Sequence, residues 1–195
     1  IGIGGTSTFY ILVKTKGIQV RREIVANTWV IGRTLSELLG TAFFVLSLSL
    51  VPITTVSAII QVSPLLVTLG AAVLLKEKVG IRRWSAITMG LLGVAIILKP
   101  WSADFQVAAL LALLGVIGLS ARDLATRRVP KKTPSLVLAL LGFGATIPAG
   151  LILISFDNVL LIPTQQEILL IILGITIGVS SYYCIVTGMR LGEVS

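Results

Sequence analysis

One pair of opposite charges at the start of the apolar run 34–51 could do chemistry. Arg33 and Glu37 are four residues apart, a spacing that places both on one face of a helix and allows an ion pair. We expect this pair at the cytoplasmic mouth of its helix, because a charge in lipid needs a partner and the partner is adjacent. The alternative role for Glu37 is that of a coupling site that takes up a proton.

A second pattern lies in the apolar run 54–75, where four residues share one helical face: Ser57, Gln61, Pro64 and Thr68. Pro64 has no amide hydrogen and leaves the carbonyl of Ile60 without its helical donor, and such backbone lines a cavity when it lies in a membrane. We expect Gln61 to hydrogen-bond a substrate, and Ser57, Ser63 and Pro64 to lie on the same translocation path. The alternative is that Gln61 and Ser63 join neighbouring helices.

The run 167–188 carries a similar stripe: Thr176, Ser180, Tyr183 and Thr187, with Tyr182 beside it. Aromatic rings at this depth stack on a flat or cationic substrate or close its path. We therefore expect Ser180, Tyr182 and Tyr183 on a translocation path. The alternative is a packed tyrosine whose hydroxyl bonds a neighbouring helix.

Arg122 and Asp123 stand at the inner end of the run 105–125. They are candidates for a salt-bridge gate that breaks on opening. The alternative is a solvated cytoplasmic rim.

The elements that must position these residues follow from composition. Of 195 residues, 55% are hydrophobic and 12% are charged, against about 25% charged in ordinary soluble domains. This composition excludes a soluble enzyme, a disordered tail and a collagen-like fibre. A membrane helix needs about 20 apolar residues, and the sequence predicts an all-α polytopic bundle with a partial span at 1–13 and six complete spans: 34–51, 54–75, 84–99, 105–125, 135–155 and 167–188.

The lysine and arginine residues lie almost entirely on one side of the predicted membrane. The net charge is +8, and every lysine and arginine except Lys99 falls at the connectors 14–33, 76–83 and 122–132 or at the C-terminal end. Cytoplasmic loops collect Lys and Arg, so these three connectors are predicted to be cytoplasmic, and the charge reports topology rather than a nucleic-acid partner. The chain has no histidine and one cysteine, Cys184. We therefore expect no catalytic residues, no metal and no cofactor.

Residues 40–57 align without a gap with 178–195, pairing Gly40 with Gly178 and Ser57 with Ser195. The two segments are predicted to cross the membrane in opposite directions, and inverted repeats are typical of secondary transporters. The first residue is Ile1 and the last is Ser195. We expect both ends to be cut, so that the chain is part of a longer protein.

Two stretches carry a family resemblance. Residues 50–69 (LVPITTVSAIIQVSPLLVTL), the turn 74–78 (LLKEK) and the span 83–98 resemble the EamA repeat of the drug/metabolite transporter superfamily, and residues 188–195 (GMRLGEVS) resemble the start of the same motif in a second repeat. The resemblance implies ten spans in two inverted halves of five. On that pattern residues 1–101 are the first repeat, lacking its first span and part of the second, and 102–195 are the second repeat, lacking its last two spans.

The prediction from sequence is a secondary transporter that moves a small metabolite across the bacterial inner membrane by alternating access. The partners expected are that metabolite and the lipid bilayer; formation of a homo-oligomer stays open. Two alternatives remain: a non-transporting membrane subunit or sensor, and an intramembrane enzyme, which would need paired acids such as Glu37 and Asp123.

Overall fold

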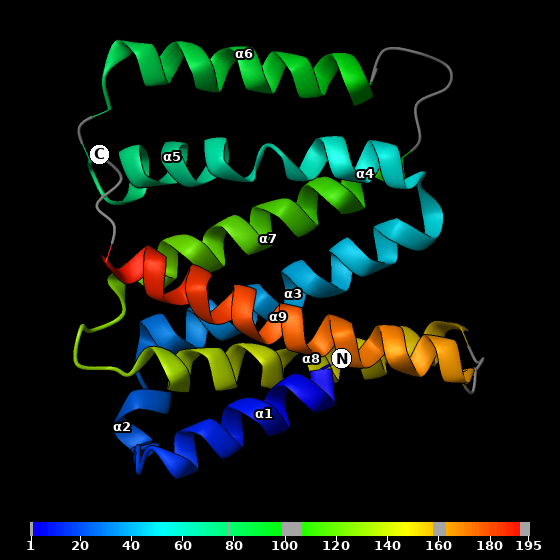
Figure 1. Ribbon diagram of the computed structural model, residues 1–195. Helices are drawn as coiled ribbons and strands as arrows, with labels where there is room; N and C mark the ends of the chain where they lie inside the picture. Colours follow the sequence, from blue (N-terminus) through cyan, green and yellow to red (C-terminus); the bar gives the residue numbers. More distant parts are fainter. Residues whose placement is uncertain (1, 78, 99–106, 158–162, 192–195) are drawn as a thin grey trace. The chain divides into compact units, whose positions relative to one another are not determined.

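A computed structural model describes residues 2–77, 79–98, 107–157 and 163–191, and every regular element in them is a helix. The all-α prediction is therefore confirmed for the described residues. Figure 1 labels the helices in chain order: α1 (Gly2–Thr15), α2 (Arg22–Val25), α3 (Thr28–Leu50), α4 (Ile53–Ile60), α5 (Ser63–Leu74), α6 (Ile81–Leu98), α7 (Ala109–Arg128), α8 (Ser135–Asp157) and α9 (Gln165–Leu191).

Six stretches among the described residues are long and apolar enough to cross a membrane: Thr28–Leu50, Ile53–Leu74, Ile81–Leu98, Ala109–Arg128, Ser135–Ile154 and Gln165–Gly188. They match the six predicted spans. The partial span at 1–13 corresponds to α1, which has 14 residues. The chain is thus a multi-pass membrane protein.

Local chemistry explains where three helices begin or end. Gly17 ends α1 with a φ of 63°, and the amide of Ile18 bonds the carbonyl of Val13 at 3.0 Å, as in a Schellman cap. The Asn27 side chain accepts a hydrogen bond from the amide of Trp29 and caps α3. Thr164 and Glu167 bond each other reciprocally before α9, which is a capping box.

Two predicted connectors are shorter than expected. Helix α3 begins at Thr28, so Arg33 lies inside a membrane-spanning helix and not in the connector 14–33. Helix α7 continues to Arg128, so it takes up most of the predicted connector 122–132, and Arg122 and Asp123 are helical, as expected for the inner end of the run 105–125. A charge usually marks the end of an apolar span, but Arg33 has hydrogen-bond partners within the protein, and the helix can therefore include it.

The predicted span 54–75 contains a break. Helix α4 ends at Ile60 and α5 begins at Ser63, with Pro64 in its first turn. The amide of Val62 turns back to the carbonyl of Ile59 at 3.0 Å, which is a 3₁₀-type bond. The interruption agrees with the expected effect of Pro64, although it lies at Gln61 and Val62 and divides the span into two helices.

The chain forms two compact units, residues 1–38 with 125–195 (unit 1) and residues 39–124 (unit 2). In unit 1, α1, α8 and α9 pack against one another (Figure 1). Their core contains Phe9, Val137, Phe143 and Val179, all buried. The N-terminal part of α3 and α9 run in opposite directions in this unit; the inverted repeat itself stays a prediction.

In unit 2, α3 and α7 approach at glycines. A Cβ on Gly40 would lie 2.8 Å from the backbone nitrogen of Leu119, and a Cβ on Gly115 would lie 2.8 Å from that of Phe44. Real Cβ atoms do not come this close to backbone, so the contact requires glycine on both helices. Gly40, which the predicted repeat pairs with Gly178, is therefore one of the glycines at which α3 and α7 come close.

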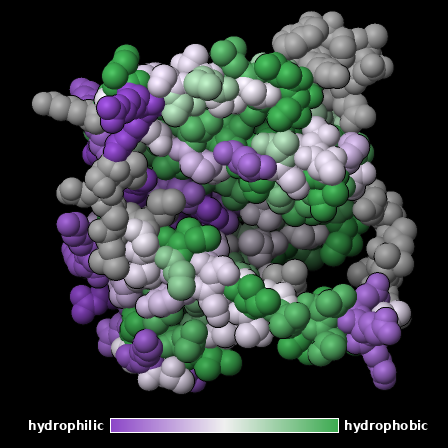
Figure 2. All heavy atoms as spheres, turned by 45° about the horizontal axis from the view of Figure 1, so that its top comes forward, coloured by the Kyte–Doolittle hydropathy of each residue, from purple (hydrophilic) through white to green (hydrophobic). Residues whose placement is uncertain are grey.

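Hydrophobic side chains are widely exposed on the spans, among them Met89 on α6 at 72% and Leu169 on α9 at 67%. Figure 2 shows hydrophobic side chains over much of the visible face and hydrophilic ones gathered in separate patches. Exposed apolar helices of this kind suit a lipid surrounding. The predicted repeat boundary at 101/102, the connector 99–105 with Lys99, and the end of the repeat alignment at 192–195 lie outside the described residues.

Candidate functional site

The buried side chain of Arg33 is the centre of a polar cluster in unit 1. Arg33 is completely buried. Its Nε donates a hydrogen bond to Oγ1 of Thr126 on α7 at 3.0 Å, and its Nη2 donates to the hydroxyl of Tyr182 on α9 at 2.8 Å. One guanidinium on α3 thus bonds two further helices, α7 and α9, through charge-assisted hydrogen bonds.

Glu37 completes the cluster one helical turn after Arg33. The Tyr182 hydroxyl donates a hydrogen bond to Oε2 of Glu37, while Nη2 of Arg33 lies 3.9 Å from the same oxygen. Tyr182 therefore stands between the two charges and bonds both. We call Arg33, Glu37, Thr126 and Tyr182 the Arg33 cluster. It holds one positive and one negative charge in a buried place, where neither charge is tolerated without the other.

Aromatic rings support the Tyr182 side chain. The Tyr182 ring lies 5.0 Å from the Phe143 ring in an edge-to-face arrangement, and Phe143 lies 5.4 Å from Phe9. A Cβ on Gly142 of α8 would overlap the Tyr182 hydroxyl and lie 3.2 Å from Nη1 of Arg33. Gly142 therefore leaves the space that the Tyr182–Arg33 contact occupies, and the rings keep Tyr182 in one orientation.

Nη1 of Arg33 has no hydrogen-bond partner among the described residues, although it is buried. A buried donor without an acceptor costs free energy, about 1–3 kcal/mol. The Arg33 cluster therefore holds a charge inside a membrane span at a cost in folding free energy. Burying a polar group inside a membrane span costs free energy, and groups that are kept there usually act on a substrate, an ion or a conformational change.

Tyr183 differs from its neighbour. It is 36% exposed, so its ring faces away from the core that holds Tyr182. Ser180 is exposed as well, and its hydroxyl bonds the carbonyl of Thr176 at 2.9 Å within α9. The stripe predicted on this helix is thus accessible at Tyr183 and Ser180, while Tyr182 belongs to the Arg33 cluster.

The polar residues of α4 and α5 lie in unit 2. Ser57, Gln61 and Pro64 are exposed, and the Gln61 amide nitrogen lies 3.4 Å from the carbonyl of Ser57. Ser63 instead meets Ser120 of α7, with 3.2 Å between the two hydroxyl oxygens. This contact is of the kind that the alternative role of Ser63 expects, but the roles of Ser57, Gln61, Ser63 and Pro64 all stay predictions, as does a hollow lined by Gln61 and Tyr183.

Arg122 and Asp123 bond each other in unit 2. Nη2 of Arg122 lies 2.7 Å from Oδ1 of Asp123, and Nε lies 2.8 Å from it. Asp123 is buried and Arg122 half-buried. Two short contacts to one carboxylate oxygen make a close ion pair, as a gate or a structural rim would need.

Sequence reasoning missed Thr126, Gly142 and the two phenylalanines, Phe9 and Phe143. Thr126 follows Asp123 by three residues on the same helix, and Gly142 and Gly144 flank Phe143. A glycine beside an aromatic residue in a span is the signal that indicates a close helix contact. Among the described residues, no group of three or more His, Cys, Asp and Glu side chains is placed to hold a metal ion.

Comparison with known families places the chain among membrane transporters. The model of the EamA-like transporter family matches residues 1–99. This range is half of the chain, and it contains the turn at 74–78 and the broken span of α4 and α5.

The chain is also similar to individual transporters. It is 30% identical over 170 residues to a riboflavin transporter of Vibrio cholerae, covering 83% of this chain and 54% of that protein. It is 33% identical over 154 residues to a riboflavin transporter of Rhizobium johnstonii, covering 77% and 50%. With an S-adenosylmethionine uptake transporter of Rickettsia bellii it shares 29% identity over 136 residues, 69% of this chain and 46% of that protein. The chain thus spans about half the length of the curated relatives it matches. No solved structure matches.

Proposed function

Since the chain belongs to the EamA-like transporter family, we propose that the protein carries a small metabolite across the bacterial cell membrane by alternating access. Two inverted halves of five spans, of which this chain holds parts, move about a central site. A gradient or the exchange of substrates drives the movement.

The observation that carries this proposal is the Arg33 cluster. Its two charges are buried in a membrane span and are held by side chains from three helices. Hydrogen bonds that join helices can break together when the helices separate. In the proposed mechanism the cluster is the gate: it keeps α3, α7 and α9 together in one state and opens in the other.

The substrate contacts we propose are Tyr183 and Gln61, because their side chains are exposed. The proposed substrate is a flat heteroaromatic metabolite, on the grounds that the relatives are named for riboflavin and for S-adenosylmethionine, and that both molecules contain a fused nitrogen heterocycle. A tyrosine ring stacks on such a plane, and an amide side chain recognises its edge. Ser57, Ser63 and Pro64 near Gln61, and Ser180 near Tyr183, are further proposed substrate contacts.

Glu37 has two roles in this scheme. As part of the gate it accepts the hydrogen bond of Tyr182. A proton-coupled transporter would in addition protonate Glu37, which would weaken that bond and open the gate. We favour the structural role, because the positive partner is one turn away. Glu37→Gln in the full-length protein decides between them: transport that keeps its response to a proton gradient supports the structural role, and a complete loss of that response with normal expression assigns coupling to Glu37.

Uptake of labelled riboflavin and S-adenosylmethionine by proteoliposomes with the full-length protein tests the proposal. We expect uptake of one of them, or of another flat heterocycle in a wider panel, and a reduction of about tenfold for Tyr183→Leu, which is the loss expected when about 1.4 kcal/mol of stacking is removed. Tyr10→Leu is the matched control, because Tyr10 is also exposed, at 58%, on α1. Equal effects of the two substitutions would reject Tyr183 as a contact.

Recovery of the cargo unchanged separates a transporter from an intramembrane enzyme, and no uptake of any panel member would favour the subunit or sensor. Glu37 and Asp123, the acids that an enzyme would use, each have a hydrogen-bond partner within their own unit. This observation supports a role in structure rather than in catalysis.

A further inference from the structure

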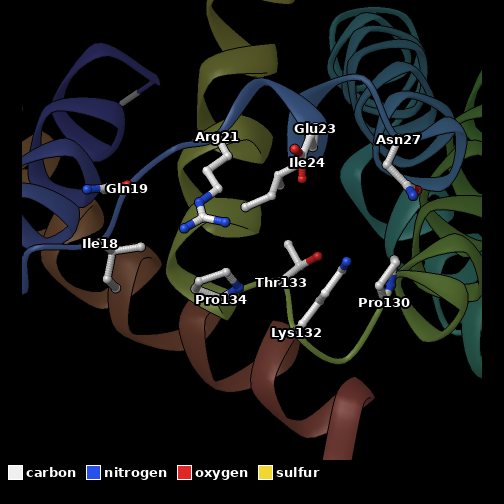
Figure 3. A pocket seen from close by; sticks show the side chains of 10 residues that line it. All are labelled: Ile18, Gln19, Arg21, Glu23, Ile24, Asn27, Pro130, Lys132, Thr133 and Pro134. Carbon is white, nitrogen blue, oxygen red and sulfur yellow. The ribbon is translucent and has the colours of Figure 1, made fainter.

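A cavity of about 530 Å³ lies in unit 1, away from the Arg33 cluster. Its walls come from two connectors, residues 18–27 between α1 and α3, and residues 130–134 between α7 and α8. Figure 3 shows side chains of both connectors around this space. Small-molecule sites usually have about 300–1,000 Å³, so the cavity has room for a ligand.

The charges of the lining are unpaired. Arg21 and Lys132 are the cations and Glu23 is the carboxylate among the lining residues. None of the three side chains makes a hydrogen bond or an ion pair with another described residue. The exposed residues Lys16 and Arg22 adjoin the connector 18–27. The two cations outnumber the one carboxylate in the lining, so the cavity has a positive potential and would attract an anion.

The remaining lining residues limit the kind of anion. Apolar surface comes from Ile18, Ile24, Pro130 and Pro134, and amide groups come from Gln19 and Asn27. The Asn27 oxygen already accepts the amide hydrogen of Trp29, so its NH₂ group remains as a donor. A guanidinium and amide donors suit the oxygens of a phosphate, and the apolar walls suit a short organic part.

We propose that this cavity binds a phosphate ester with a small organic part. Two sources supply this chemistry, the headgroup of an anionic lipid and a free phosphorylated metabolite. Both connectors are predicted to be cytoplasmic, where the leaflet is anionic and attracts basic pockets next to membrane helices. The inference concerns binding at equilibrium and does not rest on the proposed transport.

The test uses the full-length protein in detergent, in two arms. Native mass spectrometry measures the retention of phosphatidylglycerol relative to phosphatidylcholine, and calorimetric titration measures the binding of glycerol 3-phosphate without lipid. The variant is Arg21→Gln with Lys132→Gln. The matched control is Lys76→Gln with Arg82→Gln, which removes the same charge from exposed positions at the ends of α5 and α6.

We expect the Arg21/Lys132 variant to bind about tenfold more weakly and the control to bind as the wild type does, because each basic residue next to an anionic headgroup contributes several-fold to affinity. Glu23→Gln should bind more tightly, since it removes the negative charge of the lining, and a misfolded variant would not gain affinity. Loss in the lipid arm alone identifies a headgroup site, and loss in the glycerol 3-phosphate arm identifies a site for a free phosphate ester. Equal losses in variant and control, no gain in Glu23→Gln, or no binding in either arm would overturn the proposal.

Discussion

The Tyr182 hydroxyl accepts a hydrogen bond from Nη2 of Arg33 at 2.8 Å and donates one to Glu37, so a single phenol connects two buried charges that are themselves 3.9 Å apart. An ion pair at 3.9 Å is at the limit of direct contact. The hydrogen bonds to Tyr182 and Thr126 therefore contribute to the stabilisation of these charges. This dependence leads to the first two predictions.

Tyr182→Phe removes the hydroxyl and keeps the ring. Arg33 and Glu37 then lose a hydrogen bond each in a buried place, which costs about 1–3 kcal/mol for each unsatisfied group. We expect a lower midpoint of thermal unfolding in detergent, followed by Trp fluorescence. Tyr183→Phe is the control, since that ring is exposed, and it should leave the midpoint unchanged. Equal midpoints for the two variants would mean that the phenol does not connect the charges.

Arg33→Gln removes the positive charge that lies 3.9 Å from the Glu37 carboxylate. Breaking a buried pair from one side costs about 3–5 kcal/mol, whereas replacing both charges is much less costly. Glu37→Gln alone should also destabilise the protein. The double variant Arg33→Gln/Glu37→Gln should be more stable than the sum of the single changes predicts. A double-mutant cycle of unfolding free energies checks this, and strict additivity would show that the two charges act independently.

Gly142→Ala should disturb the same cluster from α8. The added Cβ would overlap the Tyr182 hydroxyl, and overpacking of a well-packed site costs about 1–3 kcal/mol. Gly144→Ala is the matched control two residues away, because a Cβ there meets nothing within 4 Å. The comparison is again the unfolding midpoint. Gly144→Ala should be neutral or slightly stabilising, because alanine favours a helix more than glycine does. An equal loss of stability in both variants would mean that contact with Tyr182 is not the cause.

In unit 2 the contact between α3 and α7 makes a separate prediction. Gly115→Ala would place a Cβ 2.8 Å from the backbone nitrogen of Phe44, and backbone cannot yield as a side chain can. We expect a loss of about 1–3 kcal/mol, whereas Gly93→Ala on α6, with open space around it, should be neutral or slightly stabilising. Measuring folded yield and unfolding midpoint in the same detergent compares the two. A neutral Gly115→Ala would mean that the helices do not approach at this glycine.

The membrane spans and the pairing of Arg33 with Glu37 could be predicted from the sequence, because both depend on local spacing. The sequence pattern predicted Arg33 in a connector, since a charge usually ends an apolar run. The partners that allow Arg33 inside the membrane, Thr126 and Tyr182, are 93 and 149 residues away. Contacts between residues so far apart in the sequence cannot be predicted from a local sequence pattern.

The two adjacent tyrosines show the same limit at the candidate site. Tyr182 and Tyr183 are equivalent by composition, and the pattern favoured the stripe that contains Tyr183. Which ring turns inward depends on the packing of α9 against Phe143 and Gly142 on α8. The exposed position of Gln61 at the break between α4 and α5 likewise follows from where the helix stops, and Pro64 indicates that point only to within a few residues.

The most direct measurement is counterflow with the full-length protein in liposomes, with no ion gradient present. Vesicles are loaded with an unlabelled heteroaromatic metabolite from the panel that includes riboflavin and S-adenosylmethionine, and labelled substrate is added outside. A transporter that alternates between two states predicts uptake of label that rises above equilibrium and then falls, and that is faster than in empty vesicles. Identical uptake by loaded, empty and protein-free vesicles for every member of the panel would contradict the account.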